Sequence, residues 1–281
     1  MATLYLVSTP IGNLDDLSPR AAGVLTSVTR ILAEDTRHTR ILTEHIGARA
    51  PLVSLHEHNE AERAGQVLRW LEADEDLALV SDAGTPLVSD PGARLVDVVA
   101  AAGHTIVPLP GASAVLAALV ASGLPTDRFV FLGFPERKGK ARTLLLERIA
   151  DSEETVVLFE SPKRLAALLA DLEDACGSMR RVAVARELTK IHEEFVRGTL
   201  RETGAYFAEH PARGEVTLVV GPAEPDDADD GRSEAAARAL ARSLMDGGLK
   251  PSAAAKEVAR TLGVPRNSAY RIVQSLSTDP T

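Results

Sequence analysis

Short apolar runs alternate with segments of helical length along the first half of the chain, and this alternation limits the folds available to it. The expected strands are Leu4–Val7, Leu77–Ser81 and Thr105–Val107, each bounded by turn residues. Glu60–Ala73 and Pro91–Ala102 carry apolar residues at three- and four-residue spacing, which predicts helices that pack on a sheet. Asp90 and Pro91 are residue types that begin a helix, as its N-cap and first residue. The alternation predicts a mostly parallel sheet with helices on its faces.

A second α/β unit is expected after the turn residues Gly123-Leu124-Pro125. Its expected strands are Phe129–Leu132, Thr155–Phe159, Val182–Ala185, Glu194–Thr199 and Val216–Val220. Two of these strands are joined by a connection too short for a helix, so this second sheet is expected to be mixed.

An acidic stretch with Pro and Gly, residues 221–231, has no apolar periodicity and is predicted to be a linker. Beyond it, Ser252–Leu262 and Ser268–Leu276 flank a Gly-containing turn, a pattern typical of a helix-turn-helix motif. The second helix would present Arg266, Asn267 and Arg271. The expected core residues are Ala255, Val258, Ala259, Leu262, Val264, Ala269, Ile272 and Val273. A helical hairpin packed on the body or on a partner subunit explains the pattern equally well.

Cysteine content and apolar runs indicate the environment of the protein. The single cysteine, Cys176, excludes an internal disulfide framework and a cysteine-built zinc site, and it fits a reducing compartment. Residues 98–126 carry no Asp, Glu, Lys or Arg, but Gly103, Pro108 and Pro125 cut this run below the roughly 20 residues that span a bilayer. The N-terminus lacks the basic region of a signal peptide. We therefore expect a cytoplasmic protein with no membrane partner and no bound metal.

Loops at the carboxyl ends of strands are where ligands bind in open α/β sheets. Ser8–Leu14 has one glycine and one proline, which argues against the Gly-rich phosphate loop of NAD enzymes and P-loop NTPases. Ser81–Gly92 and Pro110–Ala114 are rich in small residues that let a ligand lie against backbone amides. Asp82 could accept hydrogen bonds from ligand hydroxyls or close a local turn. Two such loops at one edge predict a ligand site.

Three further segments carry ionisable groups. His56-Glu57-His58 would place two imidazoles on one face of a strand, but no third ligand has a suitable spacing for a metal site. Solvated surface or RNA contact is therefore the better interpretation of this segment. Arg137–Arg142 is a basic cluster, which is either a solvated helix start or a phosphate contact. The dense ionisable groups of Arg186–Glu194 favour a functional loop between two strands.

Several motifs together resemble the tetrapyrrole methylase superfamily, which consists of class III methyltransferases dependent on S-adenosylmethionine. These motifs are Leu4–Leu14, Ala33–Arg37, Ser81–Gly92 and Pro110–Ala114. Phe159–Arg164 and Arg186–Glu193 are similar to the branch that modifies RNA of the small ribosomal subunit. Ser8–Asn13 departs from the Gly-rich first loop of most tetrapyrrole methylases, as that branch does. The resemblance covers essentially the whole chain, including the terminal helix-turn-helix.

The resemblance implies two α/β domains of the tetrapyrrole methylase type with S-adenosylmethionine in a cleft between them, plus a small all-α helix-turn-helix domain. The expected boundaries are residues 1–123, residues 124–222 completing the cleft, an acidic linker over 223–233, and the C-terminal domain over 234–281. It also implies a homodimer that methylates the 2′-hydroxyl of a cytidine in the decoding region of 16S rRNA, free or in the 30S subunit. By motif position, the cofactor-binding residues would be Pro10, Ser81, Asp82, Ala83, Gly84, Thr85, Pro86, Ser113, Ala114 and Phe159.

Methyl transfer to a ribose hydroxyl requires alignment of the reacting atoms and removal of a weakly acidic proton. Alignment contributes up to about 7–11 kcal/mol, and a positioned base adds about 10²–10⁴ in rate. The loop positions make Glu160 and Glu194 the candidate bases, whereas Lys163 or Lys190 would lower the pKa of the hydroxyl or hold a phosphate. The predicted RNA contacts are Arg137, Lys138, Lys140, Arg142, Arg266 and Arg271.

Two alternatives to an RNA methyltransferase are considered. A precorrin or uroporphyrinogen C-methyltransferase would share the fold, but the atypical first loop and the helix-turn-helix argue against it. A regulator that responds to a small molecule could bind nucleic acid without catalysis. Methyl transfer to 30S subunits, to a tetrapyrrole or to no acceptor distinguishes these functions.

The distribution of charge bears on the RNA partner. The formal net charge is -9, from 31 Lys and Arg against 40 Asp and Glu, which disfavours indiscriminate binding to phosphates. Residues 1–233 hold 24 basic and 36 acidic side chains, giving -12, whereas residues 234–281 hold 7 and 4, giving +3. A basic tail on an acidic body fits selective docking to one structured RNA.

Overall fold

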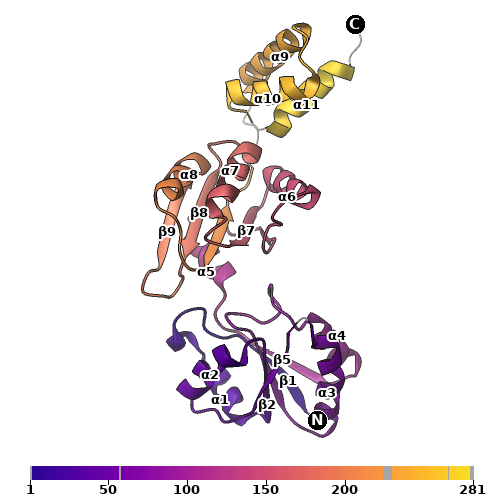
Figure 1. Ribbon diagram of the computed structural model, residues 1–281, viewed down its shortest axis with the longest axis vertical. Helices are drawn as coiled ribbons and strands as arrows, with labels where there is room; N and C mark the ends of the chain where they lie inside the picture. Colours follow the sequence, from indigo (N-terminus) through magenta and orange to yellow (C-terminus); the bar gives the residue numbers. More distant parts are fainter. Residues whose placement is uncertain (1, 57, 224–229, 265, 279–281) are drawn as a thin grey trace. The chain divides into compact units, whose positions relative to one another are not determined.

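The chain folds into two units, each with its own five-stranded sheet (Figure 1). The structure is a computed structural model that describes residues 2–56, 58–223, 230–264 and 266–278. Unit 1 comprises Met1–Ala117 and Leu188–Ile191, and unit 2 comprises Ala118–Glu187 and His192–Thr281. The division therefore falls six residues before the boundary expected at residue 123, and one short loop from the second half belongs to unit 1. Within the described ranges, no helix combines the length and apolar character needed to span a membrane.

The sheet of unit 1 is entirely parallel, with the strand order β3-β2-β4-β1-β5. Its strands are β1 (Thr3–Val7), β2 (Arg30–Ala33), β3 (Leu52–Ser54), β4 (Leu77–Val80) and β5 (Thr105–Leu109). The helical elements are η1 (Leu14–Asp16), α1 (Pro19–Ser27), α2 (Thr36–His45), α3 (Glu60–Glu72), α4 (Ala93–Ala101) and α5 (Ala114–Ala121), which begins in unit 1. The predicted parallel sheet is confirmed, and β2 and β3 extend it beyond the strands expected from the sequence.

Alternate side chains of β4 pack in two different buried clusters, which show the helices that cover each face of the unit 1 sheet. Leu77 and Leu79 pack in one buried cluster with residues of α3 and α4. Ala78 and Val80 pack in another with residues of α1 and α2. Successive side chains of a strand point to opposite faces, so α3 and α4 cover one face and α1 and α2 cover the other. A sheet buried on both sides explains the continuous apolar run of β4.

The prediction that Asp90 and Pro91 begin α4 is wrong. The helix begins at Ala93 after Gly92, whose φ of 123° is a conformation that favours glycine. Leu95 N in the first turn of α4 donates to Glu60 Oε1 at 2.9 Å, so the cap comes from the start of α3. Asp90 instead lies near the Ser81 side chain, at the carboxyl edge of the sheet.

The expected placement of His56 and His58 on one strand face is also wrong, since β3 ends at Ser54. Asn59 Oδ1, just before α3, accepts from His56 N at 2.9 Å. The two imidazole rings lie edge to face with centroids 6.0 Å apart. Glu57 lies outside the described residues.

Unit 2 contains the mixed sheet that the short strand connection predicted. Its strands are β6 (Phe129–Phe131), β7 (Thr155–Glu160), β8 (Arg181–Arg186), β9 (Glu194–Thr199) and β10 (Val216–Val220), in the order β6-β7-β10-β8-β9. β6 is parallel to β7, whereas β10 is antiparallel to both neighbours and β9 is antiparallel to β8. One buried cluster joins this sheet to its helices, α6 (Lys140–Ala150), α7 (Leu165–Cys176) and α8 (Leu200–Glu209).

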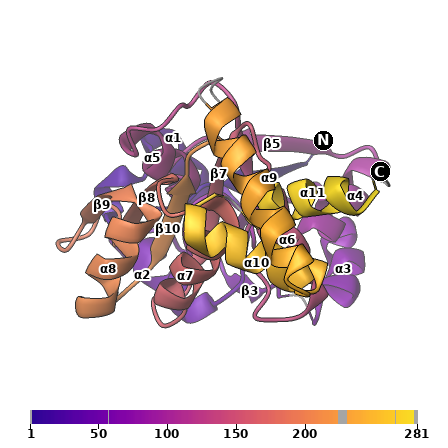
Figure 2. The same cartoon turned by 90° about the horizontal axis from the view of Figure 1, so that it is seen from above.

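Three helices, α9 (Asp230–Asp246), α10 (Pro251–Leu262) and α11 (Arg266–Thr278), form the C-terminal bundle (Figures 1 and 2). The predicted helix-turn-helix is confirmed by α10 and α11, which are separated at Gly263 in the left-handed conformation. The bundle buries Ala237 and Ala241 of α9 against α10 and α11. Leu262 is 38 % exposed, so its expected place in the core is wrong, because α10 ends there. α9 begins inside the expected linker 223–233, of which residues 224–229 lie outside the described residues.

Candidate active site

The loops that follow β1, β4 and β5 meet at the carboxyl edge of the unit 1 sheet. Thr9 N donates to Gly84 O at 2.9 Å, and Gly84 N donates to Thr9 O at 3.1 Å, which forms an isolated antiparallel bridge. Ser8 N donates to Leu109 O at 3.3 Å on the other side. Because β1 lies between β4 and β5, its loop is held between the other two loops.

Hydroxyl groups in these loops are engaged with the loops themselves. Ser81 Oγ donates to Gly84 O at 3.1 Å, and Thr85 Oγ1 donates to Ala112 O at 3.3 Å. Ser8 Oγ donates to Thr85 Oγ1 at 3.3 Å. Ser81 and Thr85 therefore fix the loop shape, so a ligand at this edge would be recognised mainly by backbone groups and by Asp82.

Two glycines at this edge permit close approach of the backbone. Gly84 has a φ of 80°, and a Cβ added there would lie 3.2 Å from Ile11 Cγ2. A Cβ added to Gly111 would lie 2.8 Å from Ser8 Cβ, which is shorter than real contacts of this kind. Larger residues at either position would push the loops apart, so the small-residue composition is a requirement of this edge.

Carboxylates gather beside the same loops. Asp35 N donates to Asp82 Oδ1 at 3.0 Å, which joins the ends of β2 and β4. Burial, followed by the charges of Glu34 and Asp82, raises the pKa of Asp90 to about 6. Burial also raises the pKa of Glu34, with smaller contributions from the charges of Asp82 and Asp35. The edge therefore presents a concentrated negative potential, which favours a positively charged ligand.

Glu34 and Asp90 were not among the site residues expected from the sequence. The sequence around Asp90 is typical of a helix N-cap and gives no indication that Asp90 lies near Glu34. Glu34 lies in the Ala33–Arg37 motif, directly after β2, and a survey of every strand end for acidic residues would have found it.

A loop from the second half of the chain packs on the first loop of unit 1. A Cβ added to Gly12 would lie 2.4 Å from Lys190 Cγ and 2.8 Å from Thr189 Oγ1. Leu188 O lies 2.9 Å from the same added atom. The structure therefore brings Lys190, a predicted catalytic residue, beside Ser8–Leu14, whereas the other three predicted catalytic residues belong to unit 2.

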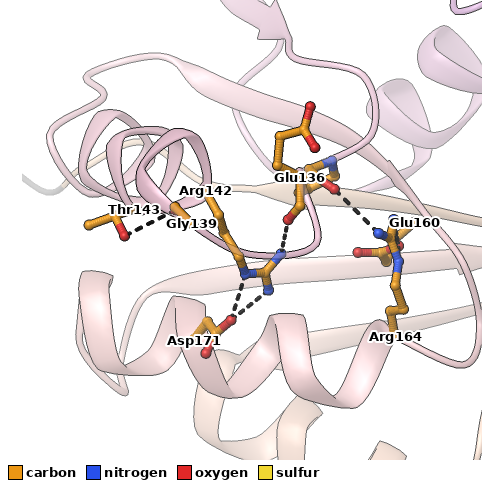
Figure 3. A network of polar contacts seen from close by, with 8 residues as sticks. Glu136, Gly139, Arg142, Thr143, Glu160, Arg164 and Asp171 are labelled. Carbon is orange, nitrogen blue, oxygen red and sulfur yellow. Dashed lines mark hydrogen bonds and ion pairs between the residues drawn. The ribbon is translucent and has the colours of Figure 1, made fainter.

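Glu160 ends β7, and its side chain is buried and ion-paired with Arg164 (Figure 3). Its Oε1 accepts from Ser161 N and from Arg164 Nε, each at 2.6 Å. Its Oε2 is buried and has no hydrogen-bond partner among the described residues. Lys163, in the same motif, is exposed. Oε1 of Glu160 is therefore engaged by protein groups.

Glu194, the other candidate base, is paired as well. Arg186 Nε lies 2.5 Å from its Oε2, and the Tyr206 hydroxyl donates to its Oε1 at 3.1 Å. The hydrogen bond from Arg186 is the main cause that lowers the pKa of Glu194, with a further contribution from Tyr206. A carboxylate with a lowered pKa is a weaker proton acceptor.

The predicted RNA contacts differ in exposure. Arg137, Lys138 and Lys140 are exposed in the segment before and at the start of α6, and Arg266 and Arg271 are exposed on α11. Arg142 is only 13 % exposed and turns inward. Its Nε and Nη2 donate to Asp171 Oδ2 at 2.9 and 2.5 Å, and its Nη1 donates to Glu136 O at 2.9 Å (Figure 3).

No group of three or more His, Cys, Asp or Glu residues suited to hold a metal ion occurs in the part of the chain that the structure describes.

Two family models match the chain. The model of the tetrapyrrole (corrin/porphyrin) methylases matches residues 3–204, and the model of the RsmI C-terminal HTH domain matches residues 231–277. Among curated relatives, a protein of Synechocystis named ribosomal RNA small subunit methyltransferase I is 47 % identical over 279 residues, which covers 99 % of this chain and 100 % of the relative. A protein of the same name from Bacillus subtilis is 41 % identical over 273 residues, covering 97 % and 93 %.

Solved structures share the fold of the methylase region. The methyltransferase CobJ is 22 % identical, with a TM-score of 0.61 over 79 % of this chain and 95 % of that chain. Uroporphyrin-III C-methyl transferase from Thermus thermophilus, solved with S-adenyl homocysteine, is 21 % identical, with a TM-score of 0.57 over 78 % and 97 %. A diphthine synthase is 15 % identical, with a TM-score of 0.62 over 78 % and 90 %.

Proposed function

The chain belongs to the tetrapyrrole methylase family and, within it, to the ribosomal RNA small subunit methyltransferase I proteins, and we propose on this premise that it methylates 16S rRNA. The acceptor would be the 2′-hydroxyl of a cytidine in the decoding region, with S-adenosylmethionine as donor. The observation that carries the proposal is the likeness to these relatives over nearly the full length, including the helix-turn-helix over residues 231–277. That domain supports a nucleic-acid acceptor in preference to a tetrapyrrole.

The carboxyl edge of unit 1 fits S-adenosylmethionine chemically. Gly84 and Gly111 let the loops after β1, β4 and β5 pack closely together, because an added Cβ would lie 3.2 Å from Ile11 Cγ2 and 2.8 Å from Ser8 Cβ, and Asp82 offers a carboxylate to hydroxyl groups. The potential of Glu34, Asp82 and Asp90 complements the positive charges of the ligand. When bound, S-adenosylmethionine supplies an electrophilic methyl group on a sulfonium. The residues proposed to hold it in unit 1 are Pro10, Ser81, Asp82, Ala83, Gly84, Thr85, Pro86, Ser113 and Ala114, and Phe159 of unit 2 has the same proposed role by motif position.

The roles proposed for the catalytic candidates follow from their contacts. Lys190 is packed against Gly12 in unit 1, so its ammonium is proposed to hold the acceptor ribose or its phosphate and to favour loss of the hydroxyl proton. Glu160, buried and paired with Arg164, is proposed to position the Phe159–Arg164 motif. Glu194 is proposed as an electrostatic partner of Arg186, because its lowered pKa makes it a weak base. Lys163 is exposed and is proposed to contact phosphate.

We further propose that the protein works in the cytoplasm as a homodimer on the 30S subunit or on free 16S rRNA. Size-exclusion chromatography with light scattering tests the dimer, and a monomer at working concentration would contradict it.

Radiolabelled methyl transfer tests the function directly. The purified protein is given labelled S-adenosylmethionine with 30S subunits, deproteinised 16S rRNA, uroporphyrinogen III or no acceptor. Label in RNA that resists alkaline cleavage at one cytidine supports 2′-O-methylation, because a methylated 2′-oxygen cannot attack the neighbouring phosphate. Label in the tetrapyrrole alone, or in no acceptor, overturns the proposal.

Lys190→Ala and Lys190→Arg provide the matched pair for the catalytic role. We expect Lys190→Ala to lower single-turnover methylation at saturating RNA and cofactor by about 10²-fold or more, and Lys190→Arg to retain part of the rate because it keeps the charge. Cofactor affinity, measured by calorimetry, should stay within a few-fold of wild type. Full turnover by Lys190→Ala contradicts the role.

A further inference from the structure

We propose that residues 133–140 form a preshaped site for an unpaired nucleotide of the RNA substrate. This segment is called the 133–140 loop. Phe134 would stack on the base, and Arg137, Lys138 and Lys140 would contact the phosphates beside it. The inference rests on the proposed function, since it specifies how part of the substrate RNA is bound.

Phe134 is exposed but supported from one side. Its side chain is 56 % exposed, although the chain has only 6 phenylalanines and most large apolar side chains lie in the core. Its ring contacts that of Phe159, with centroids 5.4 Å apart, and Phe159 in turn contacts Phe131 at 4.8 Å. A supported, exposed aromatic ring is the feature on which proteins stack unpaired bases.

The charges that follow Phe134 fit a phosphate backbone. Arg137, Lys138 and Lys140 are exposed, and with Glu136 they give residues 136–140 a net charge of +2 in a chain of net charge -9. Lys140 is the first residue of α6, where the helix dipole disfavours a cation. These cations therefore do not stabilise the helix, and an anionic partner would offset their repulsion. Basic residues next to an exposed aromatic ring are typical of protein sites that bind single-stranded RNA.

The shape of the 133–140 loop is fixed by two arginines beneath it (Figure 3). Arg142 donates to Glu136 O at 2.9 Å while its other nitrogens bind Asp171 of α7. Arg164 donates to Pro135 O at 3.4 Å and pairs with the buried Glu160. Phe159 N donates to Gly133 O at 3.0 Å, which ties the start of the loop to β7.

These contacts divide the basic residues of the segment into two roles. Arg142 and Arg164 bind protein groups and position the loop, whereas Arg137, Lys138 and Lys140 face solvent. A loop already held in shape loses less conformational entropy when it binds RNA. Arg142, which the sequence placed with the RNA contacts, is therefore inferred to be a positioning residue.

Equilibrium binding of fluorescein-labelled oligocytidylate, measured by anisotropy with the full-length protein, tests the role of Phe134. We expect Phe134→Ala to weaken binding by roughly 5- to 150-fold, with an unchanged dependence of log Kd on log salt, and Phe134→Trp to restore it. Phe129→Ala is the matched control, because Phe129 is also exposed, at 39 %, but lies at the start of β6 away from the basic segment. Equal losses for Phe129→Ala and Phe134→Ala, or none for Phe134→Ala, overturn the proposal.

The salt dependence tests the phosphate contacts. Arg137→Ala should lower the slope of log Kd against log salt by about one, whereas Phe134→Ala should leave this slope unchanged. A self-complementary RNA duplex serves as the second probe, and its binding should not depend on Phe134, because its bases are already stacked. A Phe134-dependent loss on the duplex as large as on oligocytidylate overturns the stacking role.

Asp171→Asn separates the two roles of Arg142. If Arg142 positions the loop, loss of its ionic partner loosens the loop and weakens oligocytidylate binding several-fold. If Arg142 contacts RNA, release from Asp171 strengthens binding, and that result contradicts the inference.

Methyl transfer to 30S subunits, measured in parallel, distinguishes failure of this site from failure of the proposed function. Wild-type methylation and RNA binding by Phe134→Ala would overturn the site and leave the function standing. Phe134-dependent RNA binding by a wild-type protein that methylates no RNA would support the site and overturn the function.

Discussion

Replacement of Asp90 by Asn should stabilise the protein at neutral pH and lose that effect in acid. Burial and the charges of Glu34 and Asp82 raise the pKa of Asp90 from 3.8 to about 6 in the folded chain. The native state therefore holds this proton more tightly than the unfolded state. The stabilising contribution of the protonated group is fully present below pH 3.8 and is lost as the pH rises through about 6.

The size of the effect follows from the shift of the pKa. Each pKa unit corresponds to about 1.4 kcal/mol, so the full shift corresponds to about 3 kcal/mol. Asp90 is only half-buried, and solvent screening reduces this figure to about 1.5 kcal/mol. For a protein of this size, that is a rise of roughly 3–6 °C in Tm for Asp90→Asn at about pH 8.

Scanning calorimetry from about pH 5 to about pH 8 measures the difference. Asp97→Asn is the matched control, because Asp97 is an exposed carboxylate on α4, and its Tm should follow wild type throughout. We expect the Asp90→Asn advantage to shrink steadily toward pH 5. A stability advantage that is absent at pH 8, or that grows in acid, refutes the reasoning.

Affinity for S-adenosylmethionine should fall in Asp90→Asn, because one negative charge of the proposed site is removed.

Three further predictions concern the unit 1 scaffold and the tail. Glu60→Ala removes the cap on Leu95 N and should lower the free energy of unfolding by about 0.5–2 kcal/mol in urea denaturation; an unchanged midpoint would contradict this contribution. Gly111→Ala places a Cβ 2.8 Å from Ser8 Cβ and should lower both Tm and cofactor affinity, whereas wild-type values for both would show that the loops are loosely packed. Deletion of residues 234–281 should weaken RNA binding and spare cofactor affinity, and unchanged RNA affinity would refute a docking role.

The sequence predicted the elements of the fold better than their ends. The order of the expected strands and helices follows from local apolar patterns, although β2 and β3 were missed, and the predicted parallel and mixed sheets are both confirmed. The start of α4 was wrong because its cap is supplied by Glu60, 35 residues away from Leu95 in the chain. Such a cap depends on how α3 and α4 pack, and a window around Asp90 and Pro91 carries no sign of it.

The site residues that could be predicted are those whose signal is local in the sequence, whereas residues that depend on distant contacts could not be predicted. The small-residue loops are recognisable because their composition and their place after strands are local properties. The inward turn of Arg142 depends on Asp171, 29 residues further along the chain, so its charge alone suggested an RNA contact. Phe134 lies three residues before a basic run, which is a usable signal in the sequence, but its exposure and its support by Phe159 require the folded chain.

The position of β10 has a consequence for synthesis of the protein. β10 is the last strand in sequence, yet it lies between β7 and β8 and pairs with both. On the ribosome, the strands of unit 1 before residue 110 emerge early, whereas the unit 2 sheet cannot close until Val216–Val220 leave the exit tunnel. Until then, β7 and β8 each expose an unpaired apolar edge, the kind of surface through which nascent chains aggregate. A chain that stops short of residue 216 should therefore be a target for chaperones and proteases.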